Sequence, residues 1–392
     1  NWELWIMDDH SNKETHHLIT RFLNDNRVTY INSKVKDQDR YKKTRYAALI
    51  NQALSLSTGK YITYLTDDTT YLPDRLQKMT DYFYLNPSHK IVYGGQLLRF
   101  LDGDSNVFFE SKTEAKIPLT MASNKVDHCS VMHTRKIAED VYTKYGSYWN
   151  DDPVFWHNAD AEFWKRLNEI EAFQPIDDIF EIALKTPTSF QVLNRHVPDP
   201  LPNDILVSGL SNDIYLINNQ RKRLISKESF DYFKYLSSKI VQIPDPLLYK
   251  YQTGKAVTQN QLPNQLLIKQ KGEEKFYLIQ ENKKREFINS QTLTLFSFNR
   301  LQAVEFSIET IDSITTGAPI TSEINQNNYL PDGKLFSYNE ELFLSQKNRL
   351  HLIDVNVALK LKYNIREAIT IKEKEFRCFQ QGDSFTWGFT TY

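Results

Sequence analysis

Strand-like and helix-like segments alternate along the first 200 residues of the chain. Short runs rich in β-branched and aromatic residues are typical of buried strands, and we expect strands at 3–9, 27–33, 61–65 and 90–100. Segments with helical spacing or helix-start signals lie between them, at 11–25, 44–56 and about 74–85. Ser11 followed by Glu14 predicts a capping box at the first helix. The β-α-β-α-β order predicts an α/β fold with a mostly parallel, doubly wound sheet.

The second half of the chain has a different pattern. A Pro-rich stretch at 196–204, which we interpret as a linker, ends the alternation. Three segments then share a strand, a polar turn with basic residues and a second strand, at 213–226, 275–289 and 341–354. A glycine follows each of them at a similar distance, namely Gly254, Gly317 and Gly382. We therefore expect two domains, at 1–200 and 205–392, the second being a β-rich α+β domain of three repeats at about 205–260, 263–322 and 328–388.

Basic residues lie in the predicted hairpin turns of this second domain, namely Arg221, Lys222, Arg223, Lys283, Lys284 and Arg285. Side chains of this kind are suited to an anionic polymer. The alternative, which we favour, is that they are solvated and discourage aggregation at a strand edge. No catalytic signature is visible in this half, so we expect it to serve substrate binding or assembly.

Two pairs of carboxylates follow predicted strands in the first half. Asp8-Asp9 closes the first strand, and Asp67-Asp68 comes directly after the strand at 61–65. Carboxyl ends of parallel strands meet at one edge of a sheet, where ligands bind. Carboxylates gathered there repel one another unless a cation lies between them, and Mg²⁺ or Mn²⁺ suits oxygen ligands. The alternative is that each pair only starts a turn or caps the next helix.

Composition excludes several classes of protein. With 48 basic and 49 acidic residues in a chain of 392, the net charge is near zero, which argues against nucleic acid or an anionic membrane as the main partner. No apolar run is long enough to predict a membrane span. Cys129 and Cys378 are far apart in sequence and imply no disulfide framework, so we expect a reducing, cytoplasmic compartment. The chain opens directly in a strand, and we expect an upstream piece to be missing.

Several motifs of residues 1–195 together resemble a known family. They are "WELWIMDDHSNKET", "DNRVTYINS", "KTRYAALINQALSLSTGKYITYLTDD", "YLPDRLQKM", "VDHCSVMHTRK", "YGSYWNDDPVFW" and "NADAEFWKRL". In order and with few gaps, they look like a family-2 glycosyltransferase of the GT-A fold, and most resemble the bacterial spore-coat polysaccharide transferases. The resemblance implies an enzyme that transfers a sugar from a nucleoside-diphosphate donor, a UDP- or dTDP-sugar, to a glycan or polysaccharide acceptor.

The resemblance also implies roles for individual residues. Asp9 would bind the base or ribose of the nucleotide, and Arg40 would contact the nucleotide as well. Asp67 and Asp68 match the family's DxD-type motif, which holds the sugar nucleotide together with Mg²⁺ or Mn²⁺, Asp68 being the expected metal ligand. Asp160 matches the catalytic base.

The chemistry of an inverting transfer fits these residue types. A carboxylate must take the proton of the acceptor hydroxyl as it attacks the anomeric carbon, and a divalent cation stabilises the departing diphosphate. The alternative for Asp160 is the N-cap of a helix at 161–168. Asp127 and His128, which we place in a strand, are weaker candidates near the acceptor. Trp149, Trp156 and Trp164 either stack on sugars or pack in the core.

One departure from the family leaves other interpretations open. Family members begin with an additional strand, carrying a hydroxyl-rich loop of the base-binding pocket, upstream of the point where this chain starts. The chain is then either a fragment or an enzyme with weakened nucleotide affinity. A non-catalytic glycan-binding or scaffold protein with a degenerate transferase domain is the main alternative. A nucleotidyltransferase is a second one, although no Gly-rich phosphate loop is visible. The sequence does not predict the oligomeric state.

Overall fold

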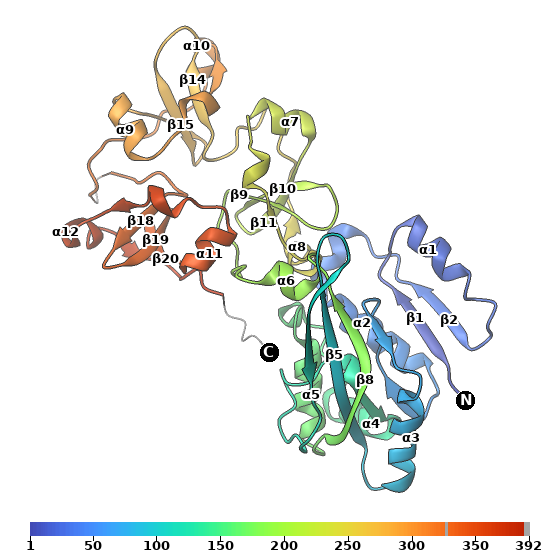
Figure 1. Ribbon diagram of the computed structural model, residues 1–392. Helices are drawn as coiled ribbons and strands as arrows, with labels where there is room; N and C mark the ends of the chain where they lie inside the picture. The colour runs from blue at the N-terminus through green and yellow to red at the C-terminus, as the bar shows by residue number, and fades with distance from the viewer. Residues whose placement is uncertain (326–327, 388–392) are drawn as a thin grey trace. The chain divides into compact units, whose positions relative to one another are not determined.

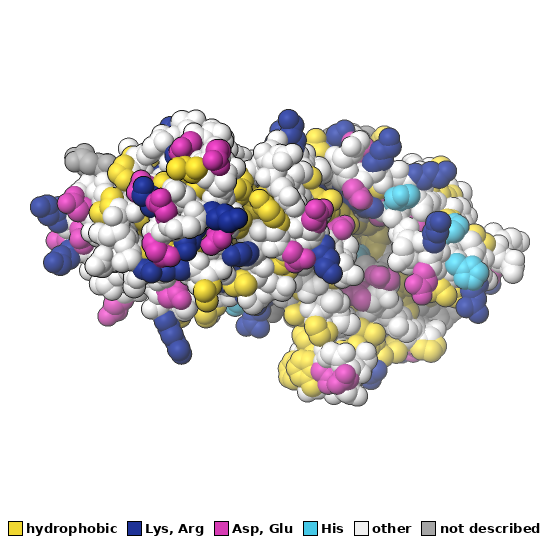
Figure 2. Space-filling view, turned by 90° about the horizontal axis from the view of Figure 1, so that it is seen from above, with side chains coloured by type: hydrophobic (Ala, Val, Ile, Leu, Met, Phe, Trp, Pro, Cys, Tyr) yellow, Lys and Arg dark blue, Asp and Glu magenta, His cyan; other side chains and the backbone are white. Residues whose placement is uncertain are grey.

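A computed structural model describes residues 1–325 and 328–387 of the chain (Figure 1). The chain divides into two compact units: unit 1 is Asn1–Val192, and unit 2 begins at Leu193. The end of the third expected repeat, at 388, and the end of the second expected domain, at 392, lie outside the described residues. Acidic and basic side chains are interspersed on the face drawn in Figure 2, in keeping with the near-zero net charge.

Unit 1 opens with a two-stranded parallel sheet. Strand β1 (Leu4–Asp8) pairs with β2 (Val28–Asn32), and α1 (Lys13–Thr20) connects them. The predicted capping box is wrong, because the N-cap is Asn12, whose side chain accepts the backbone N–H of Thr15 at 2.9 Å. Ser11 instead donates its own backbone N–H to Asp8 Oδ1. Asn and Ser are equally good N-caps, so the sequence does not separate adjacent candidates.

The main sheet of unit 1 has six strands. They run in the order β3 (Tyr61–Thr63), β7 (Val131–Thr134), β5 (Ile91–Leu101), β8 (Gln174–Lys185) and β4 (Thr69–Tyr71), and β6 (Val107–Thr113) also pairs with β5. β5 and β8, the longest strands, lie side by side and parallel (Figure 1). The pairs β3–β7, β5–β7, β5–β6 and β4–β8 are antiparallel. The expected mostly parallel sheet is therefore wrong, although the unit is a mixed α/β fold.

Helices pack on this sheet around an aromatic core. The helices are α2 (Arg45–Leu56), α3 (Arg75–Leu85), α4 (Arg135–Tyr145) and α5 (Ala159–Asn168), with 3₁₀ turns at Asp37–Lys42, His128–Ser130 and Pro153–Phe155. Trp149, Phe163 and Trp164 are fully buried in the largest cluster. The predicted helices at 44–56 and about 74–85 are confirmed as α2 and α3.

The described residues of unit 2 form three sheets, and α6 (Phe190–Asn194) spans its boundary with unit 1. The first sheet has β9 (Ile205–Ser208), β10 (Ile214–Asn218), β11 (Arg221–Ile225), β12 (Val241–Gln242) and β13 (Gln252–Thr253). The second has β14 (Leu267–Gln270), β15 (Phe276–Gln280), β16 (Lys283–Glu286) and β17 (Val304–Phe306). The third has β18 (Leu335–Tyr338), β19 (Glu341–Gln346), β20 (Arg349–Leu352), β21 (Ile369–Thr370) and β22 (Gln380–Gln381).

The three sheets share one arrangement. Each has an antiparallel meander, β9-β10-β11, β14-β15-β16 or β18-β19-β20, and a further strand parallel to its first strand. Short helices follow each meander: α7 (Lys227–Tyr232), α8 (Asp245–Lys250), α9 (Ser290–Leu295), α10 (Ile308–Asp312), α11 (Val355–Lys360) and α12 (Glu373–Phe376), with 3₁₀ turns at Ser237–Lys239, Arg300–Gln302 and Ile365–Glu367. Two apolar clusters join residues from neighbouring sheets.

The basic residues of the hairpins lie on β11 and β16 rather than in turns. Lys222 and Lys284 are buried, and their ammonium groups donate to the backbone oxygens of Leu248 and Ile311 in the helices that follow. For these two lysines both sequence interpretations, polymer contact and solvation, are therefore wrong. Their role in the structure is to hold a helix end.

The Pro-rich stretch at 196–204 packs within unit 2. Val197 and Leu201 are fully buried, and the backbone N–H of Leu201 donates to the Tyr251 hydroxyl at 2.8 Å. This stretch is thus part of a folded unit, whereas the sequence suggested a linker. Among the described residues, no helix is both long enough and apolar enough to cross a membrane.

Candidate active site

Asp9 lies just beyond the end of β1, between two arginines. Arg40 Nη1 is 2.5 Å from Asp9 Oδ2, and Arg45 Nη2 is 2.6 Å from Asp9 Oδ1. Ser33 Oγ donates to the same carboxylate at 3.1 Å. The Asp9 side chain is 27% exposed and that of Arg40 8%, so the carboxylate keeps some contact with solvent while the guanidinium of Arg40 is largely buried. Two predicted site residues, Asp9 and Arg40, are thus brought together, and Arg45 joins them.

The neighbouring Asp8 has a structural role. Its Oδ2 accepts hydrogen bonds from Tyr30 Oη at 2.6 Å and Asn32 Nδ2 at 2.7 Å, and its Oδ1 accepts the backbone N–H of Ser11. These bonds tie the end of β1 to β2 and to the start of α1. Although burial alone raises the pKa of Asp8, the hydrogen bonds outweigh it and lower the pKa.

Asp67 and Asp68 occupy a turn between β3 and β4. They do not close a strand, since β3 already ends at Thr63. Asp67 is exposed, whereas Asp68 Oδ1 accepts the Thr66 hydroxyl at 2.6 Å. Lys185 Nζ, at the end of β8, lies 3.8 Å from Asp68 Oδ2. The side chain of Asp68 is 39% exposed, which leaves this carboxylate accessible to a ligand.

Asp160 lies in the first turn of α5. The N-cap of that helix is Asn158, so the alternative that Asp160 is the N-cap is wrong. Its side chain is 19% exposed, and Oδ1 accepts the backbone N–H of Ala161. Burial raises the pKa of Asp160, and the nearby His128 opposes that effect.

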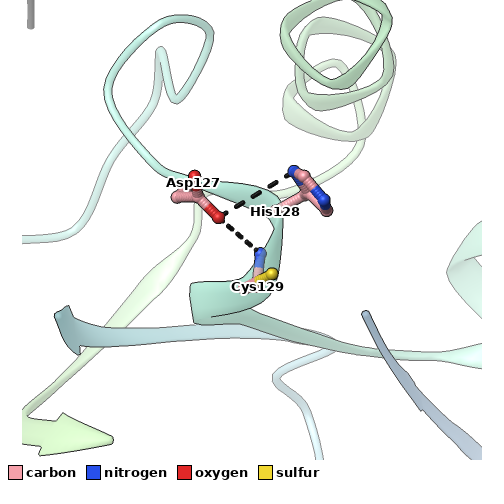
Figure 3. A group of neighbouring side chains, drawn as sticks. All are labelled: Asp127, His128 and Cys129. Atoms are coloured by element: carbon pink, nitrogen blue, oxygen red, sulfur yellow. Dashed lines mark hydrogen bonds and ion pairs between the residues drawn. The ribbon is translucent and has the colours of Figure 1, made fainter. Parts of the chain in front are cut away.

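Asp127, His128 and Cys129 form a compact turn before β7. His128–Ser130 is a 3₁₀ turn, so the placement of Asp127 and His128 in a strand is wrong. Figure 3 shows the Asp127 carboxylate facing the His128 ring and the backbone nitrogen of Cys129, which donates to Asp127 Oδ1 at 2.9 Å. Their ligand atoms lie within 4.8 Å of one another. These are three consecutive residues, so proximity alone does not make them a metal centre.

A chain of contacts joins Asp68 to Asp160 through this turn. Thr66 Oγ1, which donates to Asp68, lies 3.4 Å from Cys129 Sγ. Next to Cys129, His128 Nδ1 lies 3.9 Å from Asp160 Oδ2. Two predicted site residues from distant parts of the sequence therefore border one polar cluster. We use this name for Thr66, Asp127, His128 and Cys129.

Two residues at the start of α2 connect Asp9 and its arginine partners to α5, the helix that carries Asp160. Arg45 binds Asp9, while the adjacent Tyr46 accepts the backbone N–H of Ala159 on its hydroxyl at 2.7 Å. Neither Arg45 nor Tyr46 stands out in the sequence as a site residue. The one available signal was their place at the start of a predicted helix beside Arg40.

The tryptophans are part of the core. Trp149 and Trp164 are fully buried and Trp156 is 5% exposed, so packing is the correct alternative and sugar stacking by these rings is wrong. Trp149 Nε1 lies 3.3 Å from the Tyr64 hydroxyl, which is 2.7 Å from His133 Nε2. Burial lowers the pKa of His133 to about 4, so this histidine is a neutral structural residue.

A buried ion pair lies beneath the polar cluster. Arg75 Nε is 3.7 Å from Glu181 Oε2, and both side chains are completely buried. Glu181 Oε1 accepts the Ser130 hydroxyl at 2.6 Å, and an Arg75 Nη2–H donates to the backbone oxygen of Cys129. Burial raises the pKa of Glu181 to about 7. The pair thus supports the turn that carries His128.

Comparisons with known proteins agree with the resemblance in the sequence. The family described as "Glycosyl transferase family 2" matches residues 1–135. Protein CgeD of Bacillus subtilis is 36% identical over 92% of this chain and 83% of its own length. The putative colanic acid biosynthesis glycosyl transferase WcaA of Escherichia coli is 33% identical over 24% of this chain and 31% of its own length. Among solved structures, S. aureus TarS covers 49% of this chain and 33% of its own at 11% identity and a TM-score of 0.35, a likeness too weak to support any argument.

Proposed function

This chain belongs to glycosyl transferase family 2 and is a glycosyltransferase, and we propose that it moves a sugar from a UDP- or dTDP-sugar to a hydroxyl of a glycan or cell-surface polysaccharide with inversion. In this proposal unit 1 is a GT-A domain and carries the chemistry. The contact path from Asp68 to Asp160 is the observation that supports it most, because these two carboxylates, the proposed donor ligand and the proposed base, border the same cluster.

Asp160 acts as the base in this proposal. As the acceptor oxygen bonds to the anomeric carbon, the bond from that carbon to the diphosphate oxygen breaks, and the acceptor proton moves to Asp160. The nucleoside diphosphate leaves with the electron pair. The small exposed fraction of the Asp160 side chain restricts water around the base, which favours transfer over hydrolysis.

The donor is held on the side of Asp9 and Asp68. Asp9 accepts hydrogen bonds from the base or ribose, and the largely buried Arg40 orients it. The accessible carboxylates of Asp67 and Asp68 suit a divalent cation, since Mg²⁺ or Mn²⁺ takes one or two protein carboxylates and completes its ligands from phosphate oxygens. Such a cation, with Asp68 as its ligand, would supply positive charge to the leaving diphosphate.

Unit 2 serves as the acceptor-binding module in this proposal, built from three copies of one repeat. The shared strand arrangement of its three sheets supports the repeats. We place the enzyme in the cytoplasm, where its two free cysteines, Cys129 and Cys378, suit a reducing environment.

Calorimetric titration with UDP and with dTDP, each with and without Mn²⁺, tests the donor site. We expect metal-dependent binding of one nucleotide. Asp68→Ala should weaken that binding about tenfold or more, because it removes the metal ligand. Asp104→Ala, in the exposed turn between β5 and β6, is the matched control. Equal affinity in the Asp68 variant and the wild type would reject the metal role.

Asp160→Asn tests the base. The amide keeps the shape of the side chain but cannot take the proton, so transfer should fall by about 10²–10⁴-fold while nucleotide affinity stays within about twofold. Asp140→Asn on α4 is the control, since the Asp140 carboxylate forms an ion pair with Lys136 on the same helix. Retained transfer in Asp160→Asn would exclude this residue as the base.

A further inference from the structure

His128 lies between two carboxylates at the centre of the polar cluster. Its Nδ1 is 3.9 Å from Asp127 Oδ1 on one side and 3.9 Å from Asp160 Oδ2 on the other. The two carboxylates come from different elements, the turn before β7 and the first turn of α5. The histidine was a weak candidate from the sequence, because nothing local to it shows that Asp160 folds against it.

The ring of His128 is fixed from its remaining sides. Tyr64 and Trp149 contact it edge-on, with ring centroids at 6.5 Å and 6.3 Å. Both aromatic residues are buried, so the imidazole has little freedom to turn away from the carboxylates. The titratable residues that face it are Asp127 and Cys129 of its own turn, Asp160 of α5, and Tyr64, whose ring rather than its hydroxyl makes the contact.

The electrostatics of this arrangement favour a charged ring. Burial by itself lowers the pKa of His128, but Cys129 and the carboxylates of Asp127 and Asp160 outweigh it and raise the pKa. In return, His128 is the strongest influence that lowers the pKa of Asp160 against the effect of burial. A mostly buried carboxylate that must be ionised before each reaction cycle needs such a partner.

We propose that His128 is a positioning residue that carries a positive charge between Asp127 and Asp160 and keeps Asp160 ionised as the base. The inference rests on the proposed function, in which Asp160 accepts the proton of the acceptor hydroxyl. When Asp160 takes up the proton it becomes neutral, and the charged ring of His128 then pairs with Asp127 alone. The next cycle begins once Asp160 releases its proton to solvent. His128 thereby sets the lowest pH at which the enzyme turns over.

Proton titration by NMR tests the charge without any substrate. The His128 signals are assigned by their loss in His128→Gln. We expect the wild-type ring to stay charged through neutral pH, and Asp160→Asn to lower its pKa by about 1 unit or more. The control is His89→Gln, a histidine that contacts Tyr82 at the end of α3, which should leave the His128 titration unchanged. An uncharged His128 at pH 7, or a pKa unaltered in Asp160→Asn, would overturn the proposal.

The pH profile of turnover tests the consequence for the reaction, with the nucleotide sugar whose nucleotide the calorimetric titration selects. In His128→Gln the acidic limb of the curve of kcat against pH should move to higher pH by about 1–3 units. The KM for the donor should change less than about twofold. His128→Lys, which restores a positive charge, should move the limb part of the way back. If the acidic limb of the kcat profile stays at the same pH in His128→Gln, this inference alone is rejected. If transfer survives in Asp160→Asn, the proposed base is rejected as well.

Discussion

Arg75 and Glu181 show how many elements of unit 1 two buried side chains can connect. Glu181 holds the Ser130 hydroxyl, while the Arg75 guanidinium donates to Thr63 Oγ1 and lies 3.6 Å from the centre of the Tyr71 ring. Together they connect β3, β4 and the turn before β7. Taking both charges out of water is costly, so the pair contributes position more than stability.

Removing one member of this pair should be far more damaging than removing both. Arg75→Met leaves the Glu181 carboxylate buried without its cation, and we expect a loss of about 3–5 kcal/mol in the free energy of unfolding. Adding Glu181→Gln to that variant should restore part of the loss. Urea denaturation of the two single variants and the double variant measures the coupling.

Lys78→Met provides the control for this cycle on the same helix. Lys78 pairs with Asp74 and Asp178 at the surface, and its side chain is 45% exposed. Its loss should cost less than about 1 kcal/mol. Strictly additive effects of Arg75→Met and Glu181→Gln would contradict the coupling.

Individual site residues could be predicted from the sequence when a local motif carried them. Asp9, Asp67 and Asp68 stand out as carboxylates next to buried strands, and Asp160 stands out through the family motif. Arg45 and Glu181 have no such signal. Arg45 begins an ordinary amphipathic helix, and Glu181 alternates with apolar residues in a strand, so only the tertiary contacts reveal their partners.

At the scale of elements, the sequence predicts where strands and helices lie better than how strands pair. Apolar periodicity places β1, β2 and β5 close to their observed bounds. It contains no information on direction, because a buried run reads the same in both orientations. The turn at Asp102, whose Oδ1 accepts the backbone N–H of Asp104 and Asn106, makes β5 and β6 a hairpin and therefore antiparallel.

The glycines of unit 2 belong to a device that recurs in its three sheets. Gly254 and Gly317 lie against Arg223 and Arg285, which donate to the backbone oxygens of Lys255 and Ala318. At the third site, Gly382 lies against His351, whose Nδ1 is 2.8 Å from the backbone oxygen of Asp383. In each sheet a glycine thus allows a polar side chain of the meander to reach the backbone just beyond it.

Alanine at these glycines should have unequal effects. A Cβ at Gly382 would lie 2.1 Å from the His351 ring, so the ring must move and break its contact with Asp383. At Gly254 the nearest atom, Cγ of Arg223, is 3.1 Å away and belongs to a flexible chain. We expect Gly382→Ala to cost about 1–3 kcal/mol and Gly254→Ala clearly less. Thermal unfolding of both variants checks this order, which the opposite ranking would disprove.

For the whole molecule, buried acids in both units give stability the same dependence on pH. Burial raises the pKa of Glu181 in unit 1, and burial together with Asp204 raises the pKa of Asp332 in unit 2 to about 7. The folded state therefore binds protons more tightly than the unfolded chain at these groups. Their contribution to stability is full at low pH, below the ordinary carboxyl pKa, and is lost as pH rises toward 7.

Asp332→Asn isolates this effect in unit 2. Asp332 is 6% exposed and accepts the backbone N–H of Lys347, a bond that the asparagine oxygen can also accept. Between about pH 4 and pH 7 the wild type should lose about 3 kcal/mol more than the variant. Asp231→Asn, at an exposed position of α7, should behave like the wild type. Parallel stability curves for wild type and Asp332→Asn, measured by urea denaturation across this range, would refute the assignment.

The adjacent pair Arg45-Tyr46 at the start of α2 restricts how this sequence can evolve. One residue reaches a carboxylate, which needs a donor, and the next reaches the backbone N–H of Ala159, which needs an acceptor. A guanidinium has no acceptor atom, and it would meet the positive end of the α5 dipole. If the two residues exchanged places, the contact with Ala159 would therefore be lost, and a neutral hydroxyl would replace the guanidinium beside Asp9, so these two contacts constrain the order of the dipeptide.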